Sequence, residues 1–394
     1  GHVLRRVGTL GGAVENLSFG GVVPVGAGSV PVNGNAQVTG LAAHATNANI
    51  LVAGLQGDNQ GVYRSTNRGD TWGRIYTGPI VDLGADSASN TIVAGETGVG
   101  IQVTQNNGGL WQLRNTNLPS PGNVSAILVA DANTFYAGFA GQGGSGQVWT
   151  TVDAGLTWTE VATGTLPVGA EVRDILRDGT DLFVATNMGV YQSATAGAWT
   201  ELTGVPSQDV RALTQDSASF LFAATAAGVA VFDNPGWTQE NTGLTTLDAI
   251  SIVGDPSNAG QLFVGTRDGG MFGTTDGGDN WQFEAGGLSD PAVTKIALDA
   301  GSGTYVGTAN AGVFDLVATG STFVARPGTV GTGDLTVASA QLRIGHLTPG
   351  PVADTFIYND AVGNQIVAIN LTAATVRIAQ VLVPAGRALR IVGT

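Results

Sequence analysis

Thr151-Val-Asp153-Ala-Gly155-Leu-Thr157-Trp158 is the stretch on which the fold assignment rests, because its pattern returns along the chain. Ser65-Thr-Asn67-Arg-Gly69-Asp-Thr71-Trp72 and Thr274-Thr-Asp276-Gly-Gly278-Asp-Asn280-Trp281 repeat it closely, and Thr104-Gln-Asn106-Asn-Gly108-Gly-Leu110-Trp111 keeps the same frame. Weaker copies end at Trp199, Trp237 and Phe323. Successive aromatic residues stand between 237 − 199 = 38 and 158 − 111 = 47 residues apart. A repeat of this length, rich in short strands, is typical of a propeller blade.

Each copy also holds strand-like runs on both sides of the repeated turn. A second run ends on a small residue, as in Phe263-Val-Gly-Thr266, and a third begins after glycine, as in Gly189-Val-Tyr191. Short runs of Val, Ile, Phe and Tyr between Gly, Asn and Asp predict strands joined by tight turns. We expect the innermost strand where two apolar anchors stand three residues apart: Val38/Leu41, Ile80/Leu83, Val124/Ile127, Val172/Ile175, Val210/Leu213, Leu247/Ile250 and Val293/Ile296. The pattern predicts an all-β fold, a seven-bladed propeller of four-stranded blades.

The repeated turn resembles the Asp-box, or bacterial neuraminidase repeat, in which the box is a hairpin between the third and fourth strands of a blade. The resemblance implies that the Ser/Thr and Asp side chains bond the backbone of the turn and that the aromatic ring packs beneath it. The glycine accepts a positive φ. We therefore expect a structural role, and no catalytic one, for Asn67, Trp72, Asn106, Trp111, Asp153, Trp158, Trp199, Trp237, Asp276 and Trp281.

Two segments are predicted outside the ring. Residues 1–36 are expected to be an extended N-terminal segment, and residues 37–330 the propeller. Residues 331–394 are expected to form a small β domain. Leu342-Arg-Ile-Gly-His-Leu-Thr-Pro-Gly350, Ala353-Asp-Thr-Phe-Ile-Tyr358 and Val383-Pro-Ala-Gly386 are similar to a bacterial secreted domain of unknown function, and this resemblance implies an immunoglobulin-like sandwich.

Composition narrows the setting and excludes several kinds of site. The net charge is −14 and Lys295 is the only lysine, so the basic surface that a nucleic-acid partner requires is missing. The chain has no cysteine, and His2, His44 and His346 stand alone, so we expect no metal site and no cofactor. No apolar run is long enough for a membrane span. The lysine-poor, glycine-rich composition suggests a secreted or cell-surface prokaryotic protein.

Charged residues gather between the anchors of the innermost strands. They are Asp82, Arg173, Asp174, Arg211, Asp248 and Lys295. Because the innermost strands of a propeller line its central channel, we expect these six residues to ring one region of that channel. Two interpretations are open. The charges form a mutually compensating ring in a water-filled channel, or they form a polar ligand or partner site at its mouth.

Two classes of enzyme carry the same box. Sialidases need an arginine triad, a tyrosine nucleophile with a glutamate partner and an acidic proton donor. Their Arg-Ile-Pro motif is absent here, and the nearest string is Arg74-Ile75-Tyr76. Xyloglucanase-like enzymes have seven blades but place their cleft between two propellers, and this chain has room for one. We therefore expect that the chain is not an enzyme, with hydrolysis of a glycoside by carboxylates of different blades as the alternative.

The resulting functional hypothesis is a non-enzymatic extracellular module for binding or assembly. Its expected partner is a protein, which includes a second copy of the chain, or a surface glycan. An extended stretch such as Val22-Val23-Pro24-Val25 is able to add to a strand edge of a neighbouring copy and build a surface fibre. The alternative is that residues 1–36 lie along the same molecule. A lectin-like propeller that binds glycans is a further alternative.

Overall fold

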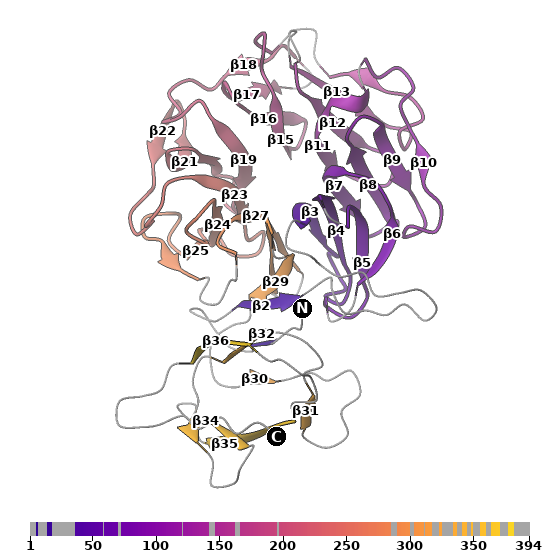
Figure 1. The fold of residues 1–394 in the computed structure, drawn as a ribbon. Helices are drawn as coiled ribbons and strands as arrows, with labels where there is room; N and C mark the ends of the chain where they lie inside the picture. The colour runs from indigo at the N-terminus through magenta and orange to yellow at the C-terminus, as the bar shows by residue number, and fades with distance from the viewer. Residues whose placement is uncertain are drawn as a thin grey trace.

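The structure confirms an all-β propeller of seven four-stranded antiparallel blades, arranged in a ring (Figure 1). The innermost strands surround the axis of the ring, where propellers have their central channel. The computed structural model describes residues 36–316, except 58, 70–71, 120, 142–145, 162–165, 195–196, 285–289, 300–302 and 311, together with short strands outside that range. Blades are numbered here in chain order, and each is given from its innermost to its outermost strand.

Blades 1 to 3 follow one another along the chain. Blade 1 contains β3 (Ala36–Ala43), β4 (Leu51–Gly57), β5 (Gly61–Ser65) and β6 (Gly73–Tyr76). Blade 2 contains β7 (Ile80–Asp86), β8 (Thr91–Glu96), β9 (Gly100–Thr104) and β10 (Gln112–Leu113). A 3₁₀ turn, η1 (Pro121–Asn123), leads into blade 3, which contains β11 (Val124–Val129), β12 (Phe135–Phe139), β13 (Gln147–Thr151) and β14 (Thr159–Glu160).

Blades 4 to 6 repeat this order. Blade 4 contains β15 (Val172–Asp178), β16 (Asp181–Thr186), β17 (Gly189–Ser193) and β18 (Thr200–Glu201). Blade 5 contains β19 (Val210–Gln215), β20 (Leu221–Thr225), β21 (Gly228–Asp233) and β22 (Gly236–Gln239). Blade 6 contains β23 (Ala249–Gly254), β24 (Leu262–Thr266), β25 (Met271–Thr274) and β26 (Gln282–Phe283).

Blade 7 is closed by a strand from the other end of the chain. It contains β27 (Val293–Leu298), β28 (Thr304–Thr308) and β29 (Val313–Leu316), and its outermost strand is β2 (Val14–Leu17). β2 runs antiparallel to β29, with Val14 opposite Leu316. The repeat ending at Phe323 had predicted this outermost strand. Phe323 lies instead in β30 (Phe323–Val324), which pairs with β1 (Arg5–Arg6).

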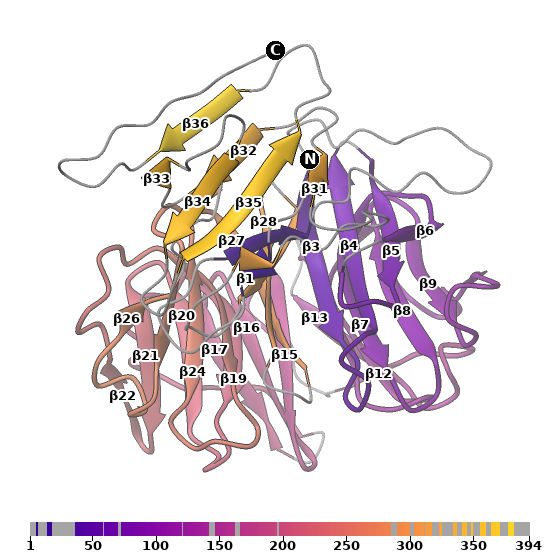
Figure 2. The same ribbon diagram turned by 90° about the horizontal axis from the view of Figure 1, so that it is seen from below.

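Because β2 precedes blade 1 along the chain, its pairing with β29 joins the last blade to the N-terminal side of the first blade. The innermost strands β27 and β3 also lie side by side, as the view in Figure 2 shows. The boundaries predicted at residues 36/37 and 330/331 remain predictions. The six strands that follow β30 are β31 (Asp334–Thr336), β32 (Gln341–Ile344), β33 (Thr348–Pro349), β34 (Thr355–Asn359), β35 (Asn364–Asn370) and β36 (Arg377–Val381).

Strands β31 to β36 make two small sheets. One has the order β31-β35-β34-β33 and the other pairs β32 with β36 in parallel. The remaining residues of the predicted C-terminal domain lie outside those that the structure describes. The immunoglobulin-like sandwich therefore stays a prediction.

A β-bulge occurs at the same place in every innermost strand. One residue is left unpaired between Val38/Gly40, Ile80/Asp82, Val124/Ala126, Val172/Asp174, Val210/Ala212, Ala249/Ser251 and Val293/Lys295. The anchors predicted for blade 6, Leu247 and Ile250, were therefore wrong by two residues. Leu247 is 43% exposed, whereas Ala249 and Ile252 are buried. An extra residue in a bulge turns the strand locally and redirects its side chains.

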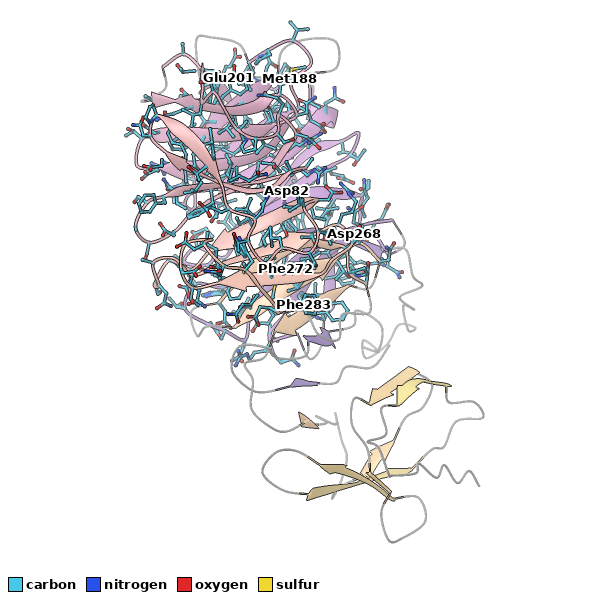
Figure 3. The ribbon with its side chains drawn as sticks, turned by 90° about the vertical axis from the view of Figure 1, so that its left-hand side faces the viewer. Asp82, Met188, Glu201, Asp268, Phe272 and Phe283 are labelled. Atoms are coloured by element: carbon cyan, nitrogen blue, oxygen red, sulfur yellow. The ribbon has the colours of Figure 1, made fainter. Side chains whose placement is uncertain are left out.

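Small residues in the second strands allow neighbouring blades to approach. A Cβ on Gly54 would stand 2.7 Å from Cγ2 of Ile80 in blade 2, and one on Gly95 would stand 3.1 Å from Cγ1 of Val124 in blade 3. The core between blades is thus built from apolar anchors that pack on glycine. Within blade 6, the rings of Phe272 and Phe283 pack edge to face with centroids 5.5 Å apart (both are labelled in Figure 3).

Candidate functional site at the channel mouth

The repeated turns are stabilised by their own side chains, as their sequence predicted. In blade 3, Thr151 Oγ1 donates to Asp153 Oδ1 at 2.7 Å and accepts the N–H of Gly155 at 3.0 Å. Asp153 Oδ1 also accepts the N–H of Thr157 at 2.9 Å. The equivalent Ser/Thr–Asp/Asn pairs are bonded in the three other well-matched turns: Ser65–Asn67, Thr104–Asn106 and Thr274–Asp276. Hydrogen bonds from Thr157 lower the pKa of Asp153 to about 2, so this carboxylate is held ionised by the turn itself.

The aromatic residue after each turn connects two blades. Trp72, Trp158 and Trp281 are buried, and Trp111, Trp199 and Trp237 are half-buried. Four of them donate their indole N–H to a backbone carbonyl of the preceding blade: Trp111 to Ile75, Trp158 to Arg114, Trp237 to Leu202 and Trp281 to Glu240. Burial with a satisfied N–H is the arrangement expected of a structural tryptophan.

Polar residues at the bulges bond each innermost strand to the next. Each of the seven junctions has one bond from a bulge side chain to the backbone of the following blade: Thr39 to Ile80 O, Asp82 from Ile127 N, Ser125 to Val172 O, Asp174 from Leu213 N, Arg211 to Ala249 O, Ser251 to Val293 O and Thr294 to Val38 O. A bulge leaves backbone groups without ladder partners, and these side chains replace the missing bonds. Three of the six predicted channel residues (Asp82, Asp174 and Arg211) therefore help to hold the ring together.

Lys295 and Asp82 come from two innermost strands, β27 and β7, so they line the channel (Asp82 is labelled in Figure 3). Lys295 Nζ stands 2.9 Å from Asp82 Oδ1 and forms an ion pair. The Lys295 side chain keeps 35% of its surface exposed, because it is deep in the molecule but faces the channel. Burial opposes the charge of Lys295, but the carboxylates of Asp82 and Asp174 outweigh it and raise its pKa.

Asp174 is the acidic residue of this group that is hardest to ionise. Burial raises its pKa from an ordinary 3.8 to about 6, and the charge of Asp82 adds to the shift. Lys295 and the N–H groups of Leu213 and Ile175 act in the opposite direction. The folded protein therefore holds the Asp174 proton more tightly than the unfolded chain does.

Stability should depend on pH through Asp174. Between about pH 4 and pH 6 folding takes up a proton at this residue, so its contribution to the free energy of unfolding falls as the pH rises. Asp174→Asn loses one acceptor for a backbone N–H at every pH but does not titrate. We therefore expect the stability of the variant, relative to the wild type, to increase from pH 4 to pH 7 in urea unfolding. A difference that stays constant across this range would contradict the assignment.

Ion pairs connect blades 4, 5 and 6 at the mouth of the channel. We call these six residues the mouth ladder, and in order they are Glu171, Arg173, Asp209, Arg211, Asp248 and Arg267. Arg211 Nη2 stands 2.8 Å from Asp209 Oδ2, and Arg267 Nε stands 2.6 Å from Asp248 Oδ2. Arg173 also pairs with Asp209, and Arg211 with Asp248. The exposed fractions of these side chains range from 15% to 57%.

Two aspartates of the ladder, Asp209 and Asp248, are held ionised. Burial would raise the pKa of Asp209, but hydrogen bonds and charge from Arg173 and Arg211 outweigh it and lower the pKa. Asp248 is lowered in the same way by Arg211 and Arg267. Burial works against the charge of Arg211, whose pKa its two carboxylates nevertheless raise. The mouth is therefore a row of fixed, alternating charges that are partly open to solvent.

The structure separates the six predicted channel residues into three positions. Asp82, Asp174 and Lys295 face the channel interior, and Arg173 and Arg211 reach from their bulges to the mouth. Asp248 lies outside the bulge, one residue before β23 begins. Sequence reasoning missed Glu171, Asp209 and Arg267. A signal was present, because an acidic residue directly precedes the first anchor in blades 4, 5 and 6.

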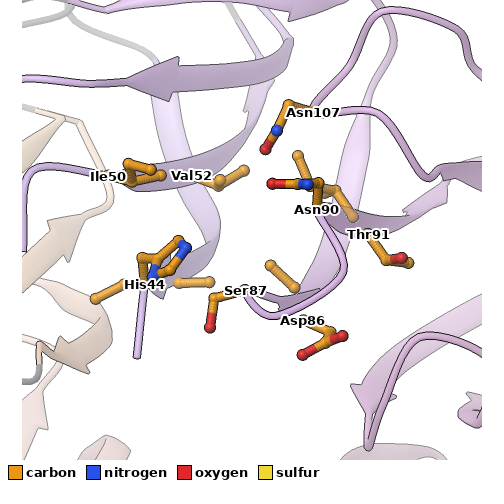
Figure 4. A pocket seen from close by; sticks show the side chains of 12 residues that line it. His44, Ile50, Val52, Asp86, Ser87, Asn90, Thr91 and Asn107 are labelled. Atoms are coloured by element: carbon orange, nitrogen blue, oxygen red, sulfur yellow. The ribbon is translucent and has the colours of Figure 1, made fainter. Parts of the chain in front are cut away.

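A small cleft lies among the turns that connect first and second strands in blades 1 and 2. His44 stands on one side of it, with Asn90 and Asn107 on the other (Figure 4). His44 Nδ1 accepts the N–H groups of Thr46 and Asn47, each at 3.2 Å. In blade 3 the carboxylate of Asp131 accepts the equivalent pair of N–H groups. These two hydrogen bonds within the turn account for a histidine at position 44. Among the described residues, no group of three or more His, Cys, Asp or Glu is arranged to hold a metal ion.

Comparison with known proteins gives relatives of the propeller. The family described as DUF6242 beta propeller domain matches residues 109–258. A xyloglucanase from Hypocrea jecorina (strain QM6a) is 26% identical over 253 residues, which is 58% of this chain and 29% of that protein. The chain therefore spans less than a third of the length of that relative.

Solved structures share the fold at low identity. YCF48 bound to D1 peptide has a TM-score of 0.59 and 13% identity, covering 73% of this chain and 95% of that one. The GH74 xyloglucanase from Xanthomonas campestris has a TM-score of 0.57 and 16% identity, covering 73% and 53%. The extracellular domain of a hybrid two component system from B. thetaiotaomicron has a TM-score of 0.56 and 15% identity, covering 76% and 42%. The propeller fold is thus related to those of YCF48 and the GH74 xyloglucanases.

These comparisons contradict the expectation that the chain is not an enzyme. The curated relative is a xyloglucanase, and two of the similar structures are GH74 enzymes, one of them an ancestral form. The expectation relied on a missing sialidase motif and on room for only one propeller. Neither observation distinguishes this chain from the xyloglucanases that have a similar propeller fold.

Proposed function

We propose that the chain is a propeller of glycoside hydrolase type that recognises neutral β-glucan chains at the mouth ladder. The observation that carries the proposal is the charge balance of the ladder, which has three arginines and three carboxylates. An anionic or cationic ligand would have to break an existing ion pair to bind there. A sugar hydroxyl both donates and accepts, so it is able to bond a carboxylate and a guanidinium together without replacing either.

Glucan as the ligand is supported by the xyloglucanase relative and by the GH74 structures. The ladder also holds two partly exposed carboxylates, Asp209 and Asp248, that stay ionised. An ionised carboxylate is the form that a glycoside hydrolase uses as its base or nucleophile. We assign that role to Asp209 or Asp248, and no role in the reaction to Asp174, because backbone N–H groups occupy both of its oxygens.

Binding should weaken when the two more exposed guanidiniums of the ladder, those of Arg173 and Arg267, are removed. Arg173→Ala and Arg267→Ala together are expected to weaken binding of a xyloglucan oligosaccharide by about tenfold or more, because hydrogen bonds to charged groups contribute about 1.5–3 kcal/mol each. Isothermal titration measures this affinity. Arg177→Ala is the matched control, because Arg177 is an exposed residue at the other end of β15 and its hydrogen bond among the described residues goes to the carbonyl of Gly179. Equal affinity in the double variant and in the control would overturn the site.

Two further comparisons complete this test. An anionic oligogalacturonide should bind more weakly than the neutral glucan, and the reverse order would contradict a charge-balanced site. Release of reducing ends from xyloglucan should fall by about 10²–10⁴-fold in Asp209→Asn or in Asp248→Asn. Binding without any release of reducing ends in the wild type would reject hydrolysis and leave glucan recognition standing.

We also propose an extracellular location and an Asp-box identity for the four bonded turns. The location is supported by similarity to the extracellular domain from B. thetaiotaomicron. Within the described part of the chain, no helix has the length and apolar character needed to cross a membrane. The Asp-box identity is supported by the repeated bonds between Ser/Thr and Asp/Asn side chains in these turns.

A further inference from the structure

Blade 7 differs from the six other blades in how its outermost strand is connected. In blades 1 to 6 the outermost strand follows the third strand along the chain, as β14 follows β13. In blade 7 the outermost strand, β2, belongs to a different part of the chain from β29. Residues 18–35 connect β2 to β3. A fully extended segment of this length reaches up to about 60 Å, so its length alone does not restrict β2 to blade 7 of its own chain.

A second short pairing extends the first. Arg5 and Arg6 stand opposite Val324 and Phe323. Between the two paired stretches, residues 7–13 and 317–322 number seven and six, so the two registers differ by one residue. The strands β1 and β2 are together called here the closing segment, and the strands β29 and β30 the receiving segment. The closing segment therefore pairs at both of its ends with one continuous stretch of chain.

We propose that the closing segment is exchangeable and pairs with the receiving segment of a second copy of this chain. Without β2, the backbone of β29 is an open strand edge, which readily accepts a strand. The same residue pairs form whether the closing segment binds its own chain or a second copy. The balance between these two states therefore depends mainly on the effective concentration of the closing segment near the receiving segment. Covalent connection within one chain sets that value on the order of 1 mM, and exchange becomes comparable when chains are locally as concentrated. This interaction is independent of glucan binding.

The absence of cysteine from the chain allows a direct test. Val14→Cys and Leu316→Cys are made as separate variants and mixed near 1 mM. Because these two positions are register partners, exchange of β2 into blade 7 of another copy brings the two thiols together and adds to the disulfide that forms by random collision. The matched control mixes Leu17→Cys with Leu316→Cys, which stand three residues out of register. We expect about threefold or more cross-linked dimer in the first mixture, measured on non-reducing gels.

A variant with both cysteines in one chain completes the test. At about 1 µM, far below the effective concentration, Val14→Cys/Leu316→Cys should cross-link within the chain. Asn16→Cys/Phe314→Cys is a second register pair that guards against unfavourable disulfide geometry at the first. If a double variant cross-links internally but the matched mixture gives no more dimer than the control, exchange is rejected. If neither double variant cross-links, closure by β2 is wrong and the proposal falls with it.

Discussion

Trp158→Ala is expected to lower the free energy of unfolding by about 3–5 kcal/mol, as large-to-small substitutions of buried aromatic residues do. The Trp158 side chain is 1% exposed and packs between blades 2 and 3. Its indole N–H donates to the carbonyl of Arg114 at 2.9 Å, so truncation leaves both a cavity and an unpaired carbonyl. Urea unfolding followed by circular dichroism measures the change.

A control from the same turn separates packing from the turn itself. Leu156 is 53% exposed, and Leu156→Ala should change stability by no more than about 0.5 kcal/mol. Trp111 is half-buried, so Trp111→Ala should cost less than Trp158→Ala, whereas Trp281→Ala should cost about as much. Equal losses at Trp111 and Trp158 would show that burial between blades is not what these residues contribute.

Asp82→Ala is expected to cost about 3 kcal/mol, the lower end of the range for breaking a buried ion pair. The substitution leaves the ammonium of Lys295 without its ion-pair partner and the N–H of Ile127 without its acceptor. The cost stays at the lower end because Lys295 is partly open to the channel, where water replaces some of the lost interaction.

The charge contribution is isolated by a second substitution. Lys295→Met removes the stranded ammonium, so the double variant Asp82→Ala/Lys295→Met should recover part of the loss, and a double-mutant cycle measures the coupling. Asp86→Ala is the matched control on the same strand. Among the described residues it removes bonds to Ala88 and Ser89 in the turn between β7 and β8, and it should cost about 1 kcal/mol. Additive effects of the two substitutions would contradict the ion pair.

Local sequence patterns were sufficient to predict the blades. The Thr151-to-Trp158 pattern predicts a turn whose bonds join residues two and four positions apart, so each copy carries its own information. The same is true of the anchors in six blades, although not in blade 6. There Asp248 was predicted to lie between the two anchors, whereas it precedes the strand, because no local feature marks which apolar pair spans the bulge.

Contacts between blades decided the candidate site and the closure of the ring. The mouth ladder joins Arg173 to Asp209 and Arg211 to Asp248, which are 36 and 37 residues apart and meet only when blades are placed side by side. Lys295 and Asp82 are 213 residues apart. The strand that closes blade 7 comes from the opposite end of the chain. The sequence of this protein therefore determined the number and form of its blades through short-range hydrogen bonding and periodicity. Only the tertiary structure decided the closure and the site, because both depend on pairings between distant residues that no local pattern specifies.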